Sequence, residues 1–211
     1  MVADRLRRLR ESGRWPQIPV GINIGKSKAT PLEGAADDYI YSFRQLSSLS
    51  DYVTINVSSP NTPGLRSLQE HEALSKLLSA IRDENRRAKK PVLLKIAPDL
   101  SPIDLEAIIA DCEANEISGI IATNTTLDHS SISSARDQAG GLSGAPLRER
   151  STEVVRFIRS RSQLPVIASG GIFDAPSARA KLNAGAHLLQ IYTGYIYRGP
   201  GLIREITDGL S

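Results

Sequence analysis

Hydrophobic residues gather in six short runs along the chain, separated by longer segments of mixed polarity. Within each run the aliphatic and β-branched residues follow one another instead of alternating with charged residues. This is the pattern of strands that are buried on both faces, as in a parallel sheet. We therefore predict strands at Val20–Gly25, Tyr52–Ser58, Val92–Ala97, Gly119–Asn124, Val166–Gly171 and Leu188–Gly194.

Four of the segments between these runs repeat an apolar residue every three or four positions, which predicts helices. Alternating strands and helices are typical of parallel β/α units. No linker, repeat or low-complexity tract divides the chain, so we expect one α/β domain over residues 1–211. The residues that mark the helices are Leu74, Leu77, Leu78 and Ile81, then Leu105, Ile108, Ile109 and Cys112, then Val154, Val155 and Ile158, and finally Ala178 and Leu182.

The first segment, Met1–Trp15, also has helical spacing, with Val2, Leu6 and Leu9 on one stripe, and Pro16 ends it. Its five arginines allow two interpretations. They could bind a membrane surface or belong to a transit peptide. We favour the simpler interpretation, in which they form the solvated face of an outer helix.

Polar and glycine residues follow each of the six predicted strands. In a parallel barrel these carboxyl ends form one face, on which active sites are built. An open doubly wound sheet binds ligands only around its switch point. Because all six strands contribute, we predict a TIM (β/α)8-type barrel. It is incomplete, because six β/α units in 211 residues fall short of the eight units and roughly 250 residues of such a barrel.

Three polar residues interrupt the apolar runs and are candidates for ligand binding. Lys95 lies within Val92–Ala97, where an ammonium is costly to bury without an anion or acceptor. It either pairs with a neighbouring carboxylate or faces a ligand that carries or develops negative charge. Asn23 and Asn56 lie at similar depth in two other runs, although strands are depleted in Asn. Together they favour a polar ligand in the mouth of the barrel.

Two glycine-containing loops end the last two predicted strands. Ser169–Gly171 precedes a helix that begins near Asp174, and Tyr192–Gly194 ends the final strand. Main-chain N–H groups at such loops form the usual phosphate site of parallel barrels. A single Gly-Gly pair is more often an ordinary turn, but the two loops together predict a phosphate site.

Composition and charge exclude several classes of protein. Apolar residues make up 40% and charged residues 23% of the chain, and no apolar run approaches the roughly 20 residues of a membrane-spanning helix. The net charge of +3 is too small to indicate nucleic acid binding. Cys112 is the only cysteine, which excludes an internal disulfide and a cysteine zinc cluster. His71, His129 and His187 lack metal-ligand spacing, so we expect no metal.

Asn56–Arg66, which reads NVSSPNTPGLR, closely resembles the signature of the quinone-dependent (class 2) dihydroorotate dehydrogenases. The resemblance covers nearly the whole chain from Pro19 onward. It implies an FMN-binding (β/α)8 barrel that oxidises dihydroorotate to orotate in pyrimidine (UMP) biosynthesis, with quinone as the final electron acceptor. The other matching segments are Gly21–Lys28, Lys95–Ser101, Ala122–Asp128, Gly140–Glu153 and Gly185–Gly194.

The resemblance also implies roles for single residues. Ser59 resembles the base that removes the C5 proton of the substrate, and Thr62 resembles a partner in that proton removal. A serine hydroxyl is a weak base, so we expect alignment of the substrate beside the hydride acceptor to do much of the work. Residues that match the orotate contacts are Asn56, Asn61, Asn124 and Thr125. Residues that match the flavin contacts are Asn23, Asn56, Lys95, Thr123, Gly144, Gly170, Gly171, Tyr192 and Thr193.

The family barrel has two further strands, a flavin-binding Ala-Gly-x-Asp-Lys segment and membrane-contacting helices that this sequence does not contain. The chain could be an oxidoreductase completed by another chain. It could be a partial product with no competent flavin site, or a non-catalytic fragment that self-associates through open strand edges. It could also be a related FMN barrel that acts on another pyrimidine. We expect the isolated chain to be soluble and inactive, although the resemblance implies a peripheral enzyme of the cytoplasmic or inner mitochondrial membrane.

Overall fold

Six parallel strands form one sheet in the computed structural model, which describes residues 2–211. Spatial order follows chain order, so every strand pairs with its neighbour in sequence. All six predicted strands are present, although the structure ends them earlier than the apolar pattern does. Their bounds are β1 (Gly21–Ile24), β2 (Tyr52–Asn56), β3 (Val92–Ile96), β4 (Gly119–Ala122), β5 (Val166–Ser169) and β6 (Leu188–Gln190).

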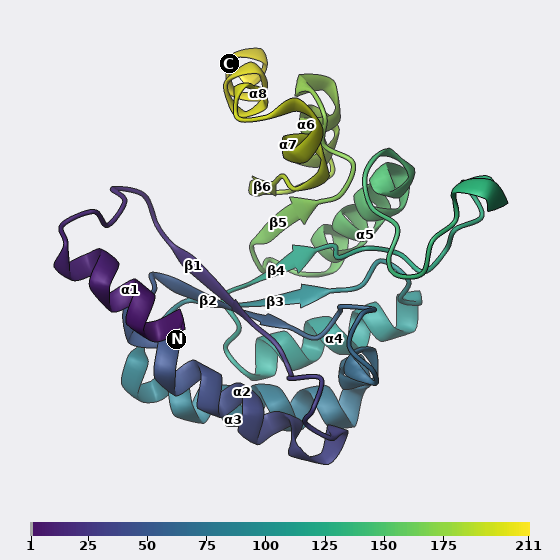
Figure 1. The fold of residues 1–211 in the computed structure, drawn as a ribbon. Helices are drawn as coiled ribbons and strands as arrows, with labels where there is room; N and C mark the ends of the chain where they lie inside the picture. The colour runs from purple at the N-terminus through teal and green to yellow at the C-terminus, as the bar shows by residue number, and fades with distance from the viewer. Residues whose placement is uncertain (1) are drawn as a thin grey trace.

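The sheet curls into a half-barrel with helices on its outer face, which confirms the incomplete barrel (Figure 1). The four helices predicted between the strands are present as α3 to α6, whereas the sequence pattern missed α2, α7 and α8. The long loops after β2 and β4 contain short 3₁₀ turns, among them Leu65–Gln69 and Ala145–Leu147. The helices are α1 (Val2–Glu11), α2 (Ala35–Leu46), α3 (His71–Ala88), α4 (Pro102–Ala114), α5 (Arg148–Arg161), α6 (Ala175–Asn183), α7 (Thr193–Arg198) and α8 (Gly201–Leu210).

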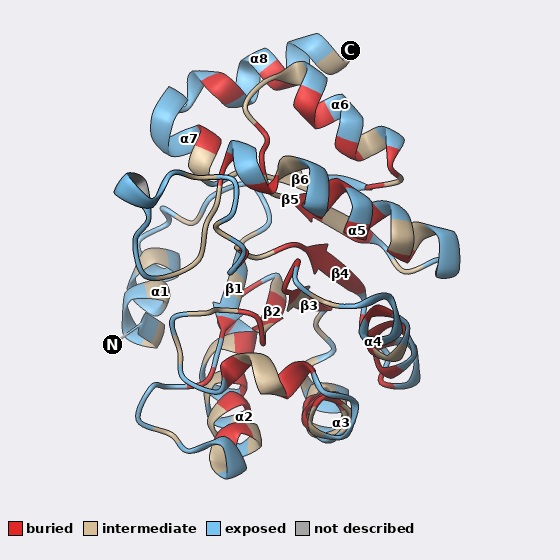
Figure 2. Ribbon diagram, turned by 90° about the vertical axis from the view of Figure 1, so that its right-hand side faces the viewer, coloured by how far each residue is buried: buried red, intermediate tan, exposed pale blue. Residues whose placement is uncertain are grey.

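The outer face of the sheet forms the main hydrophobic core. Ile24, Ile55, Leu94 and Ile120 are register partners in four neighbouring strands, and all four are buried in this core. Figure 2 shows the buried sides of the helices turned toward the sheet. Burying these rows removes apolar surface from water on the outer side, which leaves the inner side of the same strands free for other chemistry.

The inner face carries polar residues near the carboxyl ends of the strands. Asn56 is the register partner of Lys95, and Ser169 is the partner of Gln190. Side chains alternate between the two faces of a strand, so these residues point away from the aliphatic core. The same alternation that buries the apolar rows therefore places four polar side chains at one end of the half-barrel.

Local capping signals explain where two helices begin. At α4 the Ser101 hydroxyl accepts from the Asp104 N–H, and the Asp104 carboxylate accepts from the Ser101 N–H. Asp174 and Ser177 form the equivalent pair at α6, which starts just after the Ser169–Gly171 turn. Such pairs satisfy N–H groups that a helix leaves without partners. They fix the starting points of helices that follow the functional end of the sheet.

The two edges of the half-barrel are open. Within the part of the chain that the structure describes, β1 pairs only with β2, and β6 pairs only with β5. Asn23 on β1 is exposed, and Leu188 on β6 is 61% exposed. α1 near the first edge has no buried residue, in line with the solvated helix that we favoured, and Met1 lies outside the described residues. Within residues 2–211, no helix is both long and apolar enough to cross a bilayer.

Candidate functional site

A cavity of about 330 Å³ opens at the carboxyl ends of β2 to β6. Residues from all five of these strands or their loops line it, whereas β1 does not contribute. Asn23 stays exposed on β1, and Thr62 lies in the loop after β2 but outside the lining. The roles of all the predicted site residues remain predictions. The predicted residues that the cavity brings together are Asn56, Ser59, Asn61, Lys95, Thr123, Asn124, Thr125, Gly144, Gly170, Gly171, Tyr192 and Thr193.

A hydrogen-bonded cluster of side chains forms one side of the cavity. Ser58 Oγ lies 2.7 Å from Lys95 O and 3.0 Å from Asn56 Oδ1, and it accepts a hydrogen bond from Asn124 Nδ2 at 3.0 Å. The Ser58 N–H also donates to Asn56 Oδ1. With its oxygen engaged in the cluster, the Asn56 amide presents its NH₂ end as a donor for a ligand. Sequence reasoning missed the fully buried Ser58, although it lies within the signature segment.

Tyr39 holds the end of β2 from behind. Its side chain, on α2, is fully buried, and its hydroxyl donates to Asn56 O at 2.6 Å. Burial raises the pKa of Tyr39, so the hydroxyl keeps its proton and remains a donor at neutral pH. Tyr39, Phe43 and Ala35 are buried on one face at intervals of four residues, a helical signal that was present in the sequence.

Lys95 reaches across the cavity to the last strand. Its Nζ donates to Gln190 Oε1 at 2.8 Å, so its partner is a neutral amide and not the carboxylate that sequence reasoning left open. Burial lowers the pKa of Lys95 below its ordinary value. Because an ammonium has three donors, two remain beyond the Gln190 bond. Lys95 can therefore offer positive charge to a ligand, and Gln190 is a site residue that the sequence did not reveal.

Ser59 lies at the rim of this cluster, half-buried. Its Oγ accepts a hydrogen bond from the Asn61 N–H at 3.3 Å. The cavity lining, taken over the described residues, includes no histidine. Ser59 therefore lacks the neighbouring imidazole of a serine nucleophile triad, as its sequence context predicted.

Arg66 ties three loops of this side together. Its guanidinium donates to Ser58 O, to Asp99 Oδ2 at 2.6 Å, and to Thr125 O at 2.7 Å. Asp99 in turn accepts from the Thr126 hydroxyl and from the Leu127 N–H. One planar cation thus joins the loops that follow β2, β3 and β4. These loops carry Ser59 and the predicted orotate contacts after β4.

The opposite side of the cavity is formed by main chain. We call Ser169–Gly171, after β5, the glycine turn. Gly170 and Gly171 have φ values of +120° and +70°, a region that favours glycine. A Cβ on Gly171 would lie 2.5 Å from Arg148 Cβ, so α5 packs directly against the turn. Arg148, at the start of α5, donates from Nε to Gly171 O at 2.9 Å.

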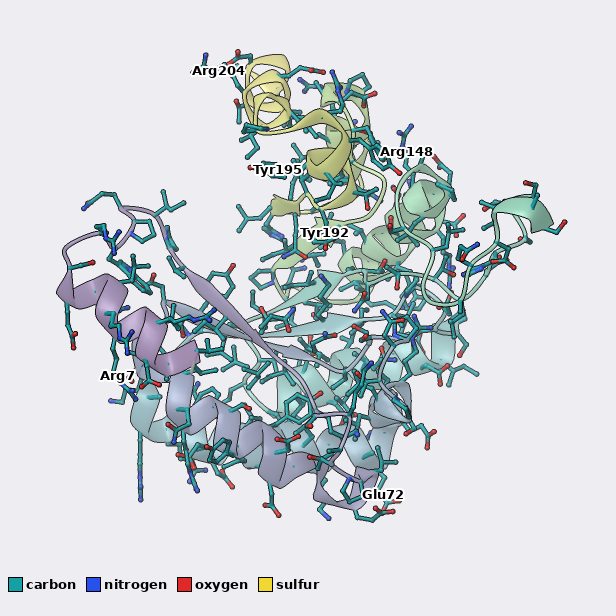
Figure 3. The ribbon with its side chains drawn as sticks, in the orientation of Figure 1. Arg7, Glu72, Arg148, Tyr192, Tyr195 and Arg204 are labelled. Atoms are coloured by element: carbon teal, nitrogen blue, oxygen red, sulfur yellow. The ribbon has the colours of Figure 1, made fainter. Side chains whose placement is uncertain are left out.

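Tyr192 and Thr193 complete this side, at the junction of β6 and α7. Thr193 Oγ1 donates to Ser143 Oγ at 3.0 Å, which links the start of α7 to the loop after β4. Tyr192 lines the cavity yet is 76% exposed, and Figure 3 shows it with Tyr195 on the open side of the half-barrel. The cavity is therefore well bounded by β2 to β5 and open beside β6.

The histidines make separate local contacts. His71 Nδ1 lies 2.9 Å from Asp111 Oδ2, and His187 Nδ1 accepts from the Val166 N–H. His129 Nδ1 lies 2.5 Å from an Asp137 carboxylate oxygen, which raises the pKa of His129. Across residues 2–211, no three His, Cys, Asp or Glu side chains are grouped so as to hold a metal ion.

Comparisons with known proteins agree on one family. The sequence model described as dihydroorotate dehydrogenase matches residues 2–211. A curated relative from Gloeobacter violaceus, named dihydroorotate dehydrogenase (quinone), is 52% identical over 211 residues, which cover 99% of this chain and 59% of that protein. A relative of the same name from Synechococcus sp. is 48% identical, covering 100% of this chain and 59% of its own. The chain thus spans about 59% of the length of these relatives.

Solved structures show the same similarity in three dimensions. The crystal structure of DHODH from Eimeria tenella in complex with ferulenol superposes with a TM-score of 0.89 at 33% sequence identity. The match covers 99% of this chain and 62% of that one. The ligand-free structure from the same organism gives a TM-score of 0.88.

Proposed function

The chain belongs to the dihydroorotate dehydrogenase family, and we propose that residues 1–211 form one partial FMN-binding barrel domain of an enzyme that oxidises dihydroorotate to orotate. FMN is the proposed hydride acceptor and quinone the final acceptor, in pyrimidine (UMP) biosynthesis. The observation that carries this proposal is the convergence of Asn56, Ser59, Asn124 and Lys95 on a single cavity, where five of the six strands end.

The donors around the cavity fit a flavin mononucleotide. The glycine turn and the Tyr192–Thr193 junction offer main chain beside a phosphate, as at the phosphate sites of other parallel barrels. Lys95 offers a cation whose partner is the neutral amide of Gln190, suited to a ring that gains negative charge on reduction. When bound, FMN supplies a two-electron acceptor for the hydride of the substrate.

The asparagine cluster is the proposed orotate side. The NH₂ end of Asn56, together with Asn61, Asn124 and Thr125, supplies donors and acceptors to a flat ring that carries carbonyl, N–H and carboxylate groups. Ser59 Oγ is the proposed acceptor of the C5 proton. Its hydroxyl is a weak base, so the fixed position of its loop, bound by Arg66 and Asp99, has to supply alignment. Thr62 is the proposed partner that passes the proton onward.

Quinone use, membrane association and self-association are further parts of the proposal. The names of the curated relatives support quinone as acceptor. The open edges of β1 and β6 support association with another polypeptide, since unpaired strand edges readily add a strand. Molar mass measured by light scattering at rising protein concentration tests association, and a constant monomer mass contradicts self-association.

The first experiment asks whether the 211-residue chain binds orotate and FMN. We expect orotate binding in calorimetry, with FMN retained or taken up as a yellow colour, and anaerobic dihydroorotate bleaching that colour wherever the flavin site is competent. Uracil is the comparison ligand, because tighter binding of uracil than of orotate would favour a related FMN barrel that acts on another pyrimidine. Binding of neither FMN nor orotate would contradict the proposed function.

The second experiment tests Ser59. Under conditions in which dihydroorotate bleaches the unmutated chain, we expect Ser59→Ala to keep orotate and FMN binding while abolishing the bleaching, because the variant lacks the proton acceptor. Ser160→Ala, at an exposed position on α5, is the matched control and should behave like the unmutated chain. Undiminished bleaching in Ser59→Ala would rule out the assigned role of Ser59.

A further inference from the structure

Lys181 is a buried cation that the proposed chemistry does not use. Its side chain, on α6, is 0% exposed. All three ammonium N–H groups donate to neutral oxygens, which are Arg148 O at 2.9 Å, Thr152 Oγ1 at 2.7 Å and Ser151 Oγ. Burying an ammonium among neutral partners is costly, and it lowers the pKa of Lys181 to about 8. A hydrophobic side chain at this position would therefore cost less free energy to bury than the ammonium does.

The partners of Lys181 are the residues that orient the glycine turn. Ser151 Oγ lies 3.3 Å from Gly170 O, and Arg148 Nε donates to Gly171 O. Both carbonyls of the glycine pair thus point toward the first turn of α5. In a trans peptide the N–H group points opposite to the carbonyl. The N–H groups of Gly171 and Ile172 consequently point away from α5, and both residues line the cavity.

The glycine turn packs tightly against the first turn of α5. A Cβ on Gly170 would lie 2.7 Å from Ser151 Oγ, and one on Gly171 would lie 2.6 Å from Arg148 Cα. The turn is therefore pressed against the residues that Lys181 bonds. A shift of the first turn of α5 would be transmitted directly to the two peptide groups of the turn.

We propose that Lys181 is a positioning residue for the glycine turn, and that its buried charge makes the turn select a phosphate dianion over an uncharged group. By binding Ser151 and the Arg148 carbonyl, Lys181 fixes the two residues that hold the turn carbonyls. Its positive charge also lies behind the outward N–H groups, in an interior where charges are weakly screened. The inference rests on the proposed function, because FMN is the flavin whose phosphate the turn receives.

The test compares two flavins that differ only in the phosphate. Dissociation constants of FMN and riboflavin are measured by fluorescence quenching on the full 211-residue chain and on Lys181→Met. We expect FMN affinity to fall about tenfold in Lys181→Met, because the turn loses both its support and the charge behind its N–H groups, while riboflavin affinity stays within about twofold. Lys76→Met removes the same charge from an exposed position on α3 and should change neither value.

Two further variants keep the test decisive where Lys181→Met does not fold. Lys181→Gln retains a donor without the charge, and Ser151→Ala retains the charge but removes the hydroxyl next to Gly170. Each should lower the FMN-to-riboflavin affinity ratio. An unchanged ratio in all folded variants overturns the role of Lys181. Equal affinity of the unmutated chain for both flavins overturns the inference and leaves the flavin site standing, whereas binding of neither flavin overturns the proposed function with it.

Discussion

The two sides of the cavity are constructed differently. On the asparagine side, formed by the ends of β2, β3 and β4, side chains such as Asn56 and Asn124 meet the ligand space. On the glycine side, formed by the ends of β5 and β6, main chain meets it. Side chains can match the several polar atoms of a ring, whereas main-chain N–H groups suit a compact charge.

Each side depends on one cation set behind it. Arg66 binds the loops of the asparagine side, and Lys181 binds the helix that supports the glycine side. Arg66 is partly exposed and pairs with a carboxylate, whereas Lys181 is enclosed by neutral oxygens. On both sides, therefore, the groups that line the cavity are held in place by a charged residue that does not itself line it, which is Arg66 on one side and Lys181 on the other. Four predictions test this comparison.

Gly171→Ala should have the largest effect, because it strikes the glycine side directly. The added Cβ meets Arg148 at 2.5 Å with φ at +70°. We expect the free energy of unfolding in urea to fall by roughly 3 kcal/mol, from left-handed strain and overpacking together. Gly64→Ala is the control, because its φ of +67° and ψ of 0° are left-handed and its added Cβ meets only Leu32 Cδ1 at an ordinary 3.8 Å, so it should lose only about 1 kcal/mol. Equal losses would show that the contact with α5 is unimportant.

Arg66→Met should come next and should affect only the asparagine side. It removes three hydrogen bonds between loops and leaves Asp99 without its cation. Because both side chains are partly exposed, we expect a loss of about 2 kcal/mol in urea unfolding. Orotate affinity should fall while the FMN-to-riboflavin ratio stays unchanged. Arg44→Met breaks a surface pair with Glu84 and should cost less than about 1 kcal/mol. A changed flavin ratio in Arg66→Met would show that the two sides are coupled.

Tyr39→Phe should have a smaller effect on the asparagine side. It removes the donor to Asn56 O and leaves that carbonyl without its partner from α2. We expect about 1 kcal/mol less stability by urea unfolding, together with weaker orotate binding. Tyr41→Phe, on the exposed face of the same helix, is the control and should change neither quantity. Unchanged stability and unchanged orotate affinity in Tyr39→Phe would show that α2 does not support the site.

His129, in the long loop after β4, should show the smallest effect, as a pH dependence. Its pairing with Asp137 raises its pKa, and its other nitrogen contacts Gly140 O. The pairing is fully present below the ordinary pKa of 6.5 and is lost as pH rises through the raised value. Limited proteolysis between residues 128 and 140 should therefore quicken with rising pH. His129→Gln should remove this dependence, and a pH dependence that persists in His129→Gln would assign it to another group.

The fold was largely predictable from the sequence because its strands are buried on both faces and read as unbroken apolar runs. The ends of the strands were not predictable, because the apolar pattern runs past them. Thr193, for example, falls in the last apolar run but begins α7. The sequence pattern did not predict α2, because the buried face of this helix is formed by Tyr39 and Phe43 in a segment that also contains two aspartates. These aromatic positions carried a helical spacing that the pattern of aliphatic residues overlooked.

The candidate site was predictable in its members but not in its connections. Lys95 could be found from its place in an apolar strand, since a charge there needs an explanation. Its partner Gln190 could not, because the two residues lie 95 positions apart and only the curl of the sheet brings them together. Lys181 was missed for a related reason, since its neutral partners lie on another helix and leave no charge pattern to detect.

The sequential order of the strands affects how the chain can fold while it is being synthesised. From β2 to β6, each strand docks on the one made just before it, so this part of the sheet can grow strand by strand in the direction of synthesis. The hydrogen bond between Lys95 and Gln190 is an exception, because it can form only after β6 has been made. During synthesis, the aliphatic core around β1 to β4 can therefore form before β6 exists, while the ligand cavity is completed only when β6 docks.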